Sequence, residues 1–463
     1  MPYGRILPTS QPRQKYFTMT TSDESLKRSY RQDWINKLLS IITLCAISGG
    51  ICLGLIVEKS GSKAWSILGL VGLIVLLIPK ERGKLNPFPQ ALKYWLYICA
   101  AVFFTACLSW WANGLDPEQA RALGSPMGKF LLTLLTVPAL LLCYRSYSRL
   151  FTQTVVASCI AGAILSGFHA LCEIFQWTFF GDQFSRKTWR ADGVVNAIYF
   201  GNIALMLGTI SAISLYQNWQ EKKWIWVFFA VNGATFGIIG SVLSLSRGGW
   251  LAGLILTSLF FFILLIKGKV KLLFLFSLLL VSALFASYFF SHEGMLKKRF
   301  QNTYENISQF DPKNSETSIG YRLRMWLQAI ENIKESPFFG SGPDSFAFIN
   351  PDPDPSLSIE SEYYHAHNDY LNTLSNTGIT GFIPLVFLYS MPLLYFTRKL
   401  FFSTSHQWPL SGACIVVLYA CFSLTDVMFY RSVGTIYFLL LIPLFMILCD
   451  HNKSNDPNGM RST

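Results

Sequence analysis

Charged residues are scarce in this chain. Asp, Glu, Lys and Arg together make up 14% of its 463 residues, whereas 52% are hydrophobic. A soluble protein of this length divides into two or three domains whose helices have polar faces. Here, apolar runs of about 20 residues recur instead, and each is long enough to cross the hydrocarbon core of a bilayer. The composition therefore excludes an ordinary soluble protein and predicts an all-α polytopic membrane protein.

The chain also lacks the usual marks of metal, disulfide and nucleotide sites. None of its 10 cysteines forms a Cys-x-x-Cys pair, and all lie within or at the ends of apolar runs, so they are interpreted as small core residues. No P-loop, protein-kinase motif set or serine elbow occurs. Gly340-Ser341-Gly342-Pro343 lacks phosphate-loop spacing and is interpreted as a turn. The sequence shows no internal repeat of the kind found in many transporters.

The formal charge of +12 comes from basic residues spread through short loops. A nucleic-acid-binding protein would gather them on one face, so membrane topology explains them better. Residues 1–37 are basic and precede the first apolar run, which favours a cytoplasmic tail over a cleaved signal peptide.

Hydropathy predicts about twelve membrane-spanning helices and a large loop. Nine spans fall within 38–290 and three within 377–449, on either side of a loop at 291–376, with a second cytoplasmic tail at 450–463. The alternation of basic and less basic loops places both termini in the cytoplasm, and the loop, Arg190, Arg247, Asp426 and Arg431 on the opposite side. The predicted spans are 38–57, 64–79, 94–111, 129–144, 153–174, 194–216, 224–244, 248–266, 270–290, 377–397, 409–428 and 433–449.

Arg247 lies between two of these spans, in Ser246-Arg247-Gly248-Gly249-Trp250. The flanking apolar runs are together too long for one crossing, so the chain must turn here, and the two glycines permit the backbone angles of a tight turn. Arg247 could be an arginine that reaches the lipid headgroups from a helix end. A guanidinium held between two bundle helices is more often functional.

Inside the large loop, residues 320–335 have the pattern of an amphipathic helix that Pro337 ends. At ~100° per residue, Arg322 borders the apolar stripe and Arg324 points towards water. The stripe expected to pack against the protein consists of Leu323, Trp326, Leu327, Ile330 and Ile333.

His365 and His367, in Tyr364-His365-Ala366-His367-Asn368-Asp369-Tyr370, allow three interpretations. A metal site is poorly supported, because zinc requires further ligands that are not nearby in the sequence. The segment could simply be the polar start of the next helix. A histidine here could also be a general base, because imidazole titrates near neutral pH.

Arginines at positions 190, 247 and 322 and the two histidines suggest a joint role. Arginine binds phosphate oxygens through two parallel hydrogen bonds and remains charged. A lipid-linked diphosphate sugar needs such a clamp, because negative charge develops on the departing diphosphate. A histidine would then remove the proton from the acceptor hydroxyl.

These segments resemble the O-antigen ligase and polymerase superfamily. The resemblance rests on Ser246-Arg247-Gly248-Gly249-Trp250, Gly320-Tyr321-Arg322-Leu323-Arg324, Pro337-Phe338-Phe339-Gly340-Ser341-Gly342-Pro343 and His365-Ala366-His367-Asn368-Asp369-Tyr370-Leu371, in this order. It runs from about residue 190 to 430. Each segment is weak alone, but the four together are fairly specific.

The resemblance implies a GT-C-like, metal-independent inverting glycosyltransferase of the bacterial inner membrane that needs no cofactor. Its donor would be a glycan on undecaprenyl diphosphate, and its acceptor lipid A-core or another hydroxyl compound at the periplasmic face. By motif, His367 is the first choice for the base and His365 the second, with Arg247, Arg322 and Arg190 on the diphosphate. A polysaccharide polymerase of the same superfamily, or an inorganic-carbon or anion transporter, remains an alternative.

Overall fold

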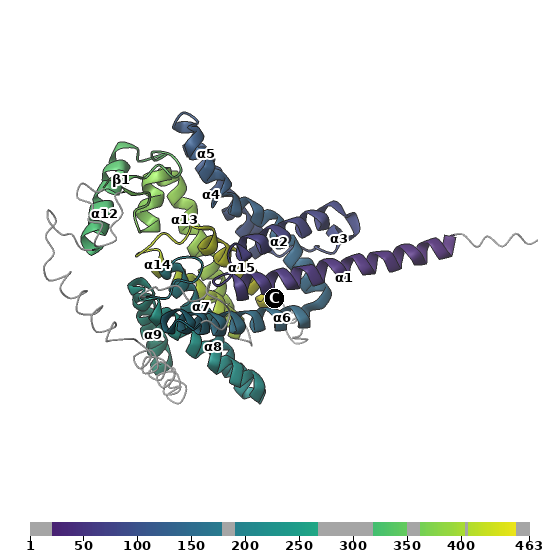
Figure 1. Cartoon of the computed structure of the whole chain (residues 1–463). Helices are drawn as coiled ribbons and strands as arrows, with labels where there is room; N and C mark the ends of the chain where they lie inside the picture. The colour runs from purple at the N-terminus through teal and green to yellow at the C-terminus, as the bar shows by residue number, and fades with distance from the viewer. Residues whose placement is uncertain (1–20, 178–189, 267–317, 350–361, 403–405, 451–463) are drawn as a thin grey trace, which may run out of the picture.

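The computed structural model describes residues 21–177, 190–266, 318–349, 362–402 and 406–450 (Figure 1). Helices dominate these ranges, and the two strands found within them, β1 (Phe348–Ile349) and β2 (Glu362–Tyr363), form one short antiparallel pair. The helices are α1 (Thr21–Leu53), α2 (Ser60–Leu77), α3 (Pro79–Gly83), α4 (Gln90–Ala112), α5 (Pro117–Gly124), α6 (Gly128–Phe175), α7 (Ala197–Gln220), α8 (Trp224–Leu243), α9 (Arg247–Ile266), α12 (Ser318–Glu335), α13 (Asp369–Phe402), α14 (Gln407–Phe422) and α15 (Ser432–Asp450).

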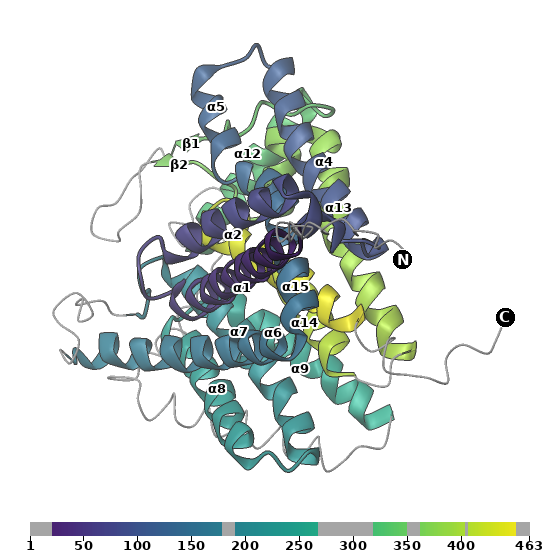
Figure 2. The same cartoon turned by 90° about the vertical axis from the view of Figure 1, so that its right-hand side faces the viewer.

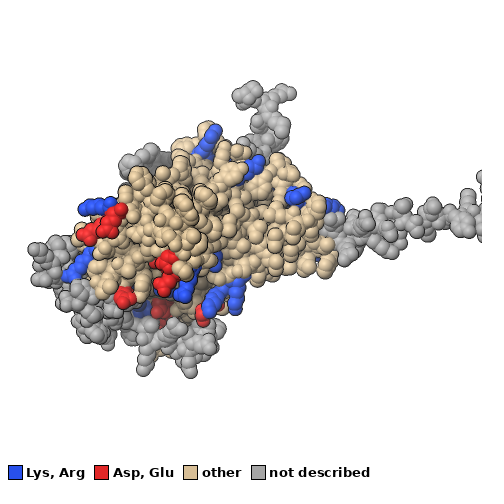
Figure 3. Space-filling model, turned by 90° about the horizontal axis from the view of Figure 1, so that it is seen from above, with Lys and Arg blue, Asp and Glu red and all other residues tan. Residues whose placement is uncertain are grey.

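The predicted all-α polytopic membrane fold is confirmed. Among the described residues, 8 helical stretches are long and apolar enough to cross a membrane. The predicted span 270–290 and most of the predicted loop lie outside the described residues, and every other predicted span overlaps a helix. Most of the face seen in Figure 3 carries no charged side chain, as expected of a surface that meets lipid.

Several element boundaries differ from the sequence-based prediction. α6 covers both 129–144 and 153–174, with a kink at Tyr147 where φ is −143° and ψ is 54°. α1 begins at Thr21 and α13 at Asp369, both ahead of the predicted spans. Polar residues do not stop a helix as Gly and Pro do, so these helices continue beyond their apolar runs. α14 ends at Phe422, well before residue 428, and the chain that follows it contributes to the candidate site.

α15 is the central helix of the bundle. The apolar stretch of this helix that is long enough to cross a membrane is 89% buried. The helix packs against α2, α4, α6, α7, α13 and α14 (Figure 2). Beside it, α7 and α8 approach closely because Gly208 faces Gly237. A Cβ atom added at Gly237 would lie 2.6 Å from the Cα atom of Gly208. Small residues at such crossings allow membrane helices to pack backbone to backbone.

α12 is amphipathic as predicted, but a different face is buried. The buried stripe is Tyr321, Met325 and Ala329, whereas the side chains of Leu327 and Ile330 are 56% and 39% exposed. The predicted stripe is therefore wrong at Leu327 and Ile330, whereas Leu323, Trp326 and Ile333 are half-buried. Hydrogen bonds with partners on other segments fix the rotation of this helix, and the small side chain of Ala329 permits a close approach.

Candidate functional site

The histidine loop is held against the start of α13. Asn368 caps this helix, because its side-chain oxygen accepts hydrogen bonds from the backbone N–H groups of Tyr370, at 3.0 Å, and Leu371, at 3.1 Å. The carbonyl of Ala366 accepts a 3.0 Å hydrogen bond from the indole N–H of Trp326 on α12. His367 itself has φ of 47°, in the left-handed region that costs about 1–3 kcal/mol for most residues. Such strain is typical of functional sites.

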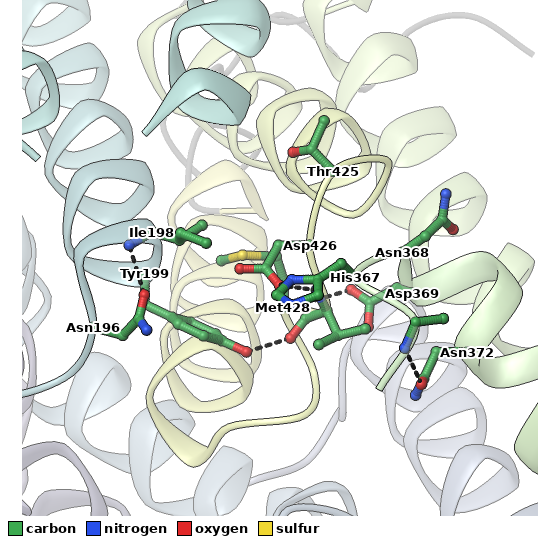
Figure 4. Close-up of polar contacts among 12 residues, drawn as sticks. Asn196, Ile198, Tyr199, His367, Asn368, Asp369, Asn372, Thr425, Asp426 and Met428 are labelled. Atoms are coloured by element: carbon green, nitrogen blue, oxygen red, sulfur yellow. Dashed lines mark hydrogen bonds and ion pairs between the residues drawn. The ribbon is translucent and has the colours of Figure 1, made fainter. Parts of the chain in front are cut away.

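His367 is paired with a buried carboxylate that sequence reasoning did not assign to the site. Its Nδ1 atom lies 3.0 Å from Oδ1 of Asp426, and the same oxygen accepts a 2.9 Å hydrogen bond from the Val427 N–H (Figure 4). Asp426 is only 2% exposed. When Nδ1–H donates to this carboxylate, Nε2 becomes the ring nitrogen that can accept a proton.

Several opposing influences act on the Asp426 carboxyl. Burial by itself raises its pKa, but the hydrogen bond from His367 and the nearby charges of His367 and Arg322 outweigh burial and leave the pKa well below its usual range. The carboxylate is therefore ionised throughout the physiological pH range. It can orient His367 and stabilise the imidazolium that forms when the ring takes up a proton.

The segment between α14 and α15 carries Asp426 and is held in place by Asp369. The Asp369 carboxylate accepts hydrogen bonds from the Ser423 hydroxyl at 2.6 Å and from the Met428 and Phe429 N–H groups at 2.7 and 3.4 Å. The Tyr199 hydroxyl on α7 donates to the Val427 carbonyl (Figure 4). Non-helical backbone among membrane helices needs such internal partners.

Two of the predicted arginines meet next to this pair. Arg322 comes from α12, and burial lowers its pKa while the nearby Asp426 carboxylate raises it. Arg247, at the first position of α9, is close enough to Arg322 for the two guanidinium groups to repel each other. Arg322 faces the carboxylate, and with Arg247 beside it this region has excess positive charge, which a bound anion would neutralise.

The turn before α9 brings Arg247 to this position in a way that differs from the prediction. The residue with positive φ is Leu245, at 55°, while Gly248 and Gly249 are helical. Their role is close packing, because a Cβ atom at Gly248 would lie 2.1 Å from Oγ1 of Thr425, the residue before Asp426.

Arg190 lies beside the same turn. The N–H of its neighbour Ala191 donates a 3.0 Å hydrogen bond to the Leu243 carbonyl, at the end of α8. The buried carboxylate of Glu173 accepts hydrogen bonds from the Asp192 and Gly193 N–H groups at 3.1 and 3.2 Å. Burial lowers the pKa of Arg190, and Asp192 is the charged neighbour that raises it. The structure thus brings His365, His367, Arg247 and Arg322 together and places Arg190 next to the turn that carries Arg247.

His365 packs between His367 and Tyr430. The ring centroid of His365 lies 4.2 Å from that of His367 and 4.8 Å from that of Tyr430. Burial is the main cause that lowers the pKa of His365 to about 4, so this ring is neutral at pH 7. A neutral ring of such low basicity is a poor proton acceptor, and this favours His367 as the base.

We expect this buried ring to make the protein sensitive to acid. The His365 pKa is 6.5 in the unfolded chain and about 4 in the folded protein. Between these values the unfolded chain binds the extra proton, so the free energy of unfolding is fully retained above pH 6.5 and falls as the pH drops towards 4. Replacing His365 with Phe should make the fall in melting temperature between about pH 7.5 and pH 4.5 smaller. His406→Phe, at an exposed position, serves as the control. Equal falls in wild type and His365→Phe would contradict this assignment.

His365, His367 and Asp426 carry three groups of the kind that can bind a metal ion. Ligand atoms of His365, His367 and Asp426 all lie within 4.8 Å of one another. However, Nδ1 of His367 is already hydrogen-bonded to the carboxylate, and the positive charge of Arg322 acts on the same carboxylate. The arrangement therefore fits an imidazole–carboxylate pair better than a cation site.

The Pro337–Pro343 motif braces α12 against α13. The Ser341 N–H donates to the Ser375 carbonyl at 2.9 Å, and the Ile379 N–H donates to the Pro337 carbonyl at 2.9 Å. A Cβ atom at Gly340 would lie 2.4 Å from the backbone carbon of Asn376. These contacts agree with the interpretation of Gly340–Pro343 as a turn. The motif packs against α13, and the histidine loop leads into the start of the same helix.

Comparison with known proteins shows what part of this chain is similar to. Residues 232–386 match the profile of a family described as O-Antigen ligase. Over these residues the chain is similar to an O-antigen ligase family. A Haemophilus influenzae protein described only as uncharacterized is 26% identical over 381 residues, which cover 82% of this chain and 89% of that protein.

The O-antigen ligase match includes Arg247, Arg322 and both loop histidines, whereas Arg190 and Asp426 lie outside it. Asp426 nevertheless carries a signal in the sequence, because it is an acidic residue within the apolar run predicted at 409–428. An ionisable residue in such a run is a candidate functional residue with a partner elsewhere.

Proposed function

We propose that this protein is a metal-independent inverting glycosyltransferase of the bacterial inner membrane. It moves a glycan from undecaprenyl diphosphate to an acceptor hydroxyl at the periplasmic face, and both of its termini are cytoplasmic. The main support is the 3.0 Å hydrogen bond between His367 and Asp426 next to the Arg322 guanidinium. A base and an anion-binding group beside each other are what this reaction needs.

The proposed reaction is a single displacement at the anomeric carbon. Nε2 of His367 takes the proton of the acceptor hydroxyl, whose oxygen forms the new bond to the anomeric carbon. The bond from that carbon to the diphosphate oxygen breaks, and the electron pair leaves with the diphosphate. Asp426 stabilises the imidazolium, while Arg247 and Arg322 stabilise the charge on the diphosphate. Arg190 is proposed as a third phosphate-binding residue.

A polymerase would use the same chemistry with a lengthening glycan as the acceptor, so the site residues would keep these roles. A transporter fits this site less well. Anion transport uses cations, but it does not require a buried carboxylate that holds an imidazole in one tautomer. The His367–Asp426 pair therefore favours transfer.

The proposal can be tested by changing the phosphate-binding charge. In cells that lack this protein, lipid-linked glycan should accumulate, and the wild-type gene should clear it. Arg322→Ala should lower the rate of transfer about 10²-fold, as expected when one group that stabilises developing charge is removed.

Arg324→Ala is the matched control, because Arg324 is two residues away in α12 and lies over the Tyr321 ring, 5.6 Å from its centroid. The readouts are mass spectrometry of lipid-linked glycan and the amount of transferred glycan, with EDTA present throughout. Wild-type transfer in Arg322→Ala, or unchanged lipid-linked glycan in the deletion strain, would refute the assignment.

A further inference from the structure

A cavity of about 80 Å³ lies on the α4 side of α13 and reaches the wall formed by Tyr430. Its lining comes from α4, from the chain around α5 and the start of α6, from α13, and from residues 343–344 and 429–430. A cavity that holds one water needs roughly 10–15 Å³ on this measure, so there is room for a small chemical group.

The lining changes in character along α13. At the start of the helix, Asp344, Asn372 and Asn376 provide polar groups. Towards the bilayer, the same cavity is lined by Val102, Phe130, Leu385 and Leu388. A site with one polar and one apolar end fits an amphiphile whose head lies near the histidine loop and whose chain runs between α4 and α13.

The polar end can recognise hydroxyl groups. Asn372 and Asn376 use their side-chain oxygens to accept hydrogen bonds from the Ala366 and Phe346 N–H groups, each at 3.1 Å, so their amide NH₂ groups can donate to a ligand. Asp344 is a hydrogen-bond acceptor that also interacts with the Tyr430 hydroxyl. A sugar hydroxyl both donates and accepts, so it complements this mixture.

The polar end of the cavity differs in charge from the region around Arg247 and Arg322. Asp344 lines the cavity, and no Lys or Arg is among the described residues that do so. A phosphate group carries negative charge and only accepts hydrogen bonds at neutral pH, so it is disfavoured here and favoured beside Arg247 and Arg322.

We infer that this cavity holds the acceptor, and that the acceptor is an amphiphile with an uncharged, hydroxyl-rich head. The inference rests on the proposed function. The rings of Tyr430 and His365 lie between the cavity and His367. The head of the ligand must therefore extend past these rings to present its hydroxyl to Nε2, while its chain stays between α4 and α13.

Binding can be tested without any transfer assay. The probe is an alkyl glucoside with a photoreactive diazirine in its chain, added to the purified full-length protein in phospholipid vesicles. Irradiation should label peptides from α4 and α13 around residues 102–106 and 385–388. Unlabelled alkyl glucoside should compete, and an alkyl phosphate of the same chain length should compete at least 10-fold less well. Equal competition would indicate a site for any lipid and would overturn the inference.

Three variants make the test specific. Val102→Trp fills the cavity and should abolish labelling, whereas Phe104→Trp, at a position 67% exposed on the same helix, should not. Asp344→Asn removes the charge and should let the alkyl phosphate compete as well as the glucoside. Its φ of 60° suits asparagine. Labelling that survives Val102→Trp, or phosphate exclusion that survives Asp344→Asn, would refute the proposed cavity.

Failure of the inference can be separated from failure of the proposed function. In a transfer assay, Val102→Trp should raise the KM for the acceptor at least 10-fold and leave the KM for the lipid-linked donor unchanged. If transfer occurs and neither KM changes, the acceptor binds elsewhere and only the inference fails. If labelling follows the pattern above but no transfer is found, the amphiphile site stands and the glycosyltransferase assignment fails.

Discussion

Replacing His367 with asparagine is expected to lower the rate of glycan transfer by about 10³-fold, within the range that general base catalysis provides. Asparagine tolerates the left-handed backbone at this position, where φ is 47°, so the loop should keep its shape. Asp426→Asn should have an effect of similar size, because it breaks the 3.0 Å interaction that orients the ring and leaves the Arg322 guanidinium without its nearby carboxylate.

The double variant gives the sharper result. If His367 and Asp426 act as one unit, the variant that lacks both should be little slower than His367→Asn alone. The rates come from single-turnover transfer, and melting temperatures in detergent show that each variant is folded. Asp116→Asn is the matched control, because it makes the same chemical change at a helix-capping carboxylate of α5. Losses that multiply in the double variant would show that the two residues act independently.

A methyl group at position 248 is expected to impair both stability and glycan transfer. In Gly248→Ala, the new Cβ atom would lie 2.1 Å from Oγ1 and 3.0 Å from Cβ of Thr425. Thr425 precedes Asp426, so relief of this clash must move the segment that supports His367. Overpacking of this kind typically costs 1–3 kcal/mol. We therefore expect a clear fall in melting temperature and at least a 10-fold loss of transfer.

Gly253→Ala provides the comparison within α9. There the nearest atom to the added Cβ is a Leu205 side-chain carbon at 3.4 Å, an ordinary contact, so stability and transfer should be nearly unchanged. Combining Gly248→Ala with Thr425→Ala removes the clashing oxygen and should restore much of the activity. If Gly248→Ala behaves like Gly253→Ala, the close contact between α9 and the Asp426 segment does not position the site.

Features that depend on local chemistry could be predicted from the sequence. Apolar runs of membrane length located the spans, and an arginine between two such runs identified the turn at Arg247. Arg322 was predicted from its place beside the apolar stripe of an amphipathic helix, and His367 from the histidine motif that precedes Asn368. In the structure Arg322 lies near the His367–Asp426 pair and Arg247 lies near Arg322, while their roles as diphosphate clamp and base stay predictions.

Other features depend on contacts between distant segments and could not be predicted in this way. Asp426 appeared as one polar residue in a predicted span, because nothing local shows that α14 ends at Phe422. The packing face of α12 depends on partners such as Ala366, which outweigh its most apolar stripe. The two glycines after Arg247 were interpreted through their backbone freedom, whereas close packing against Thr425 and Asn202 is what requires them.

The non-helical stretch between α14 and α15 also has a consequence for biogenesis. Its carboxylate completes a centre whose other members come from α9, α12 and the histidine loop, all of which leave the ribosome earlier. While the chain is being inserted, those earlier members lack their counterion, and the centre is assembled only when α14 and α15 have joined the bundle. Partly inserted chains would therefore be inert towards lipid-linked sugars, and catalytic competence would report that membrane insertion is complete.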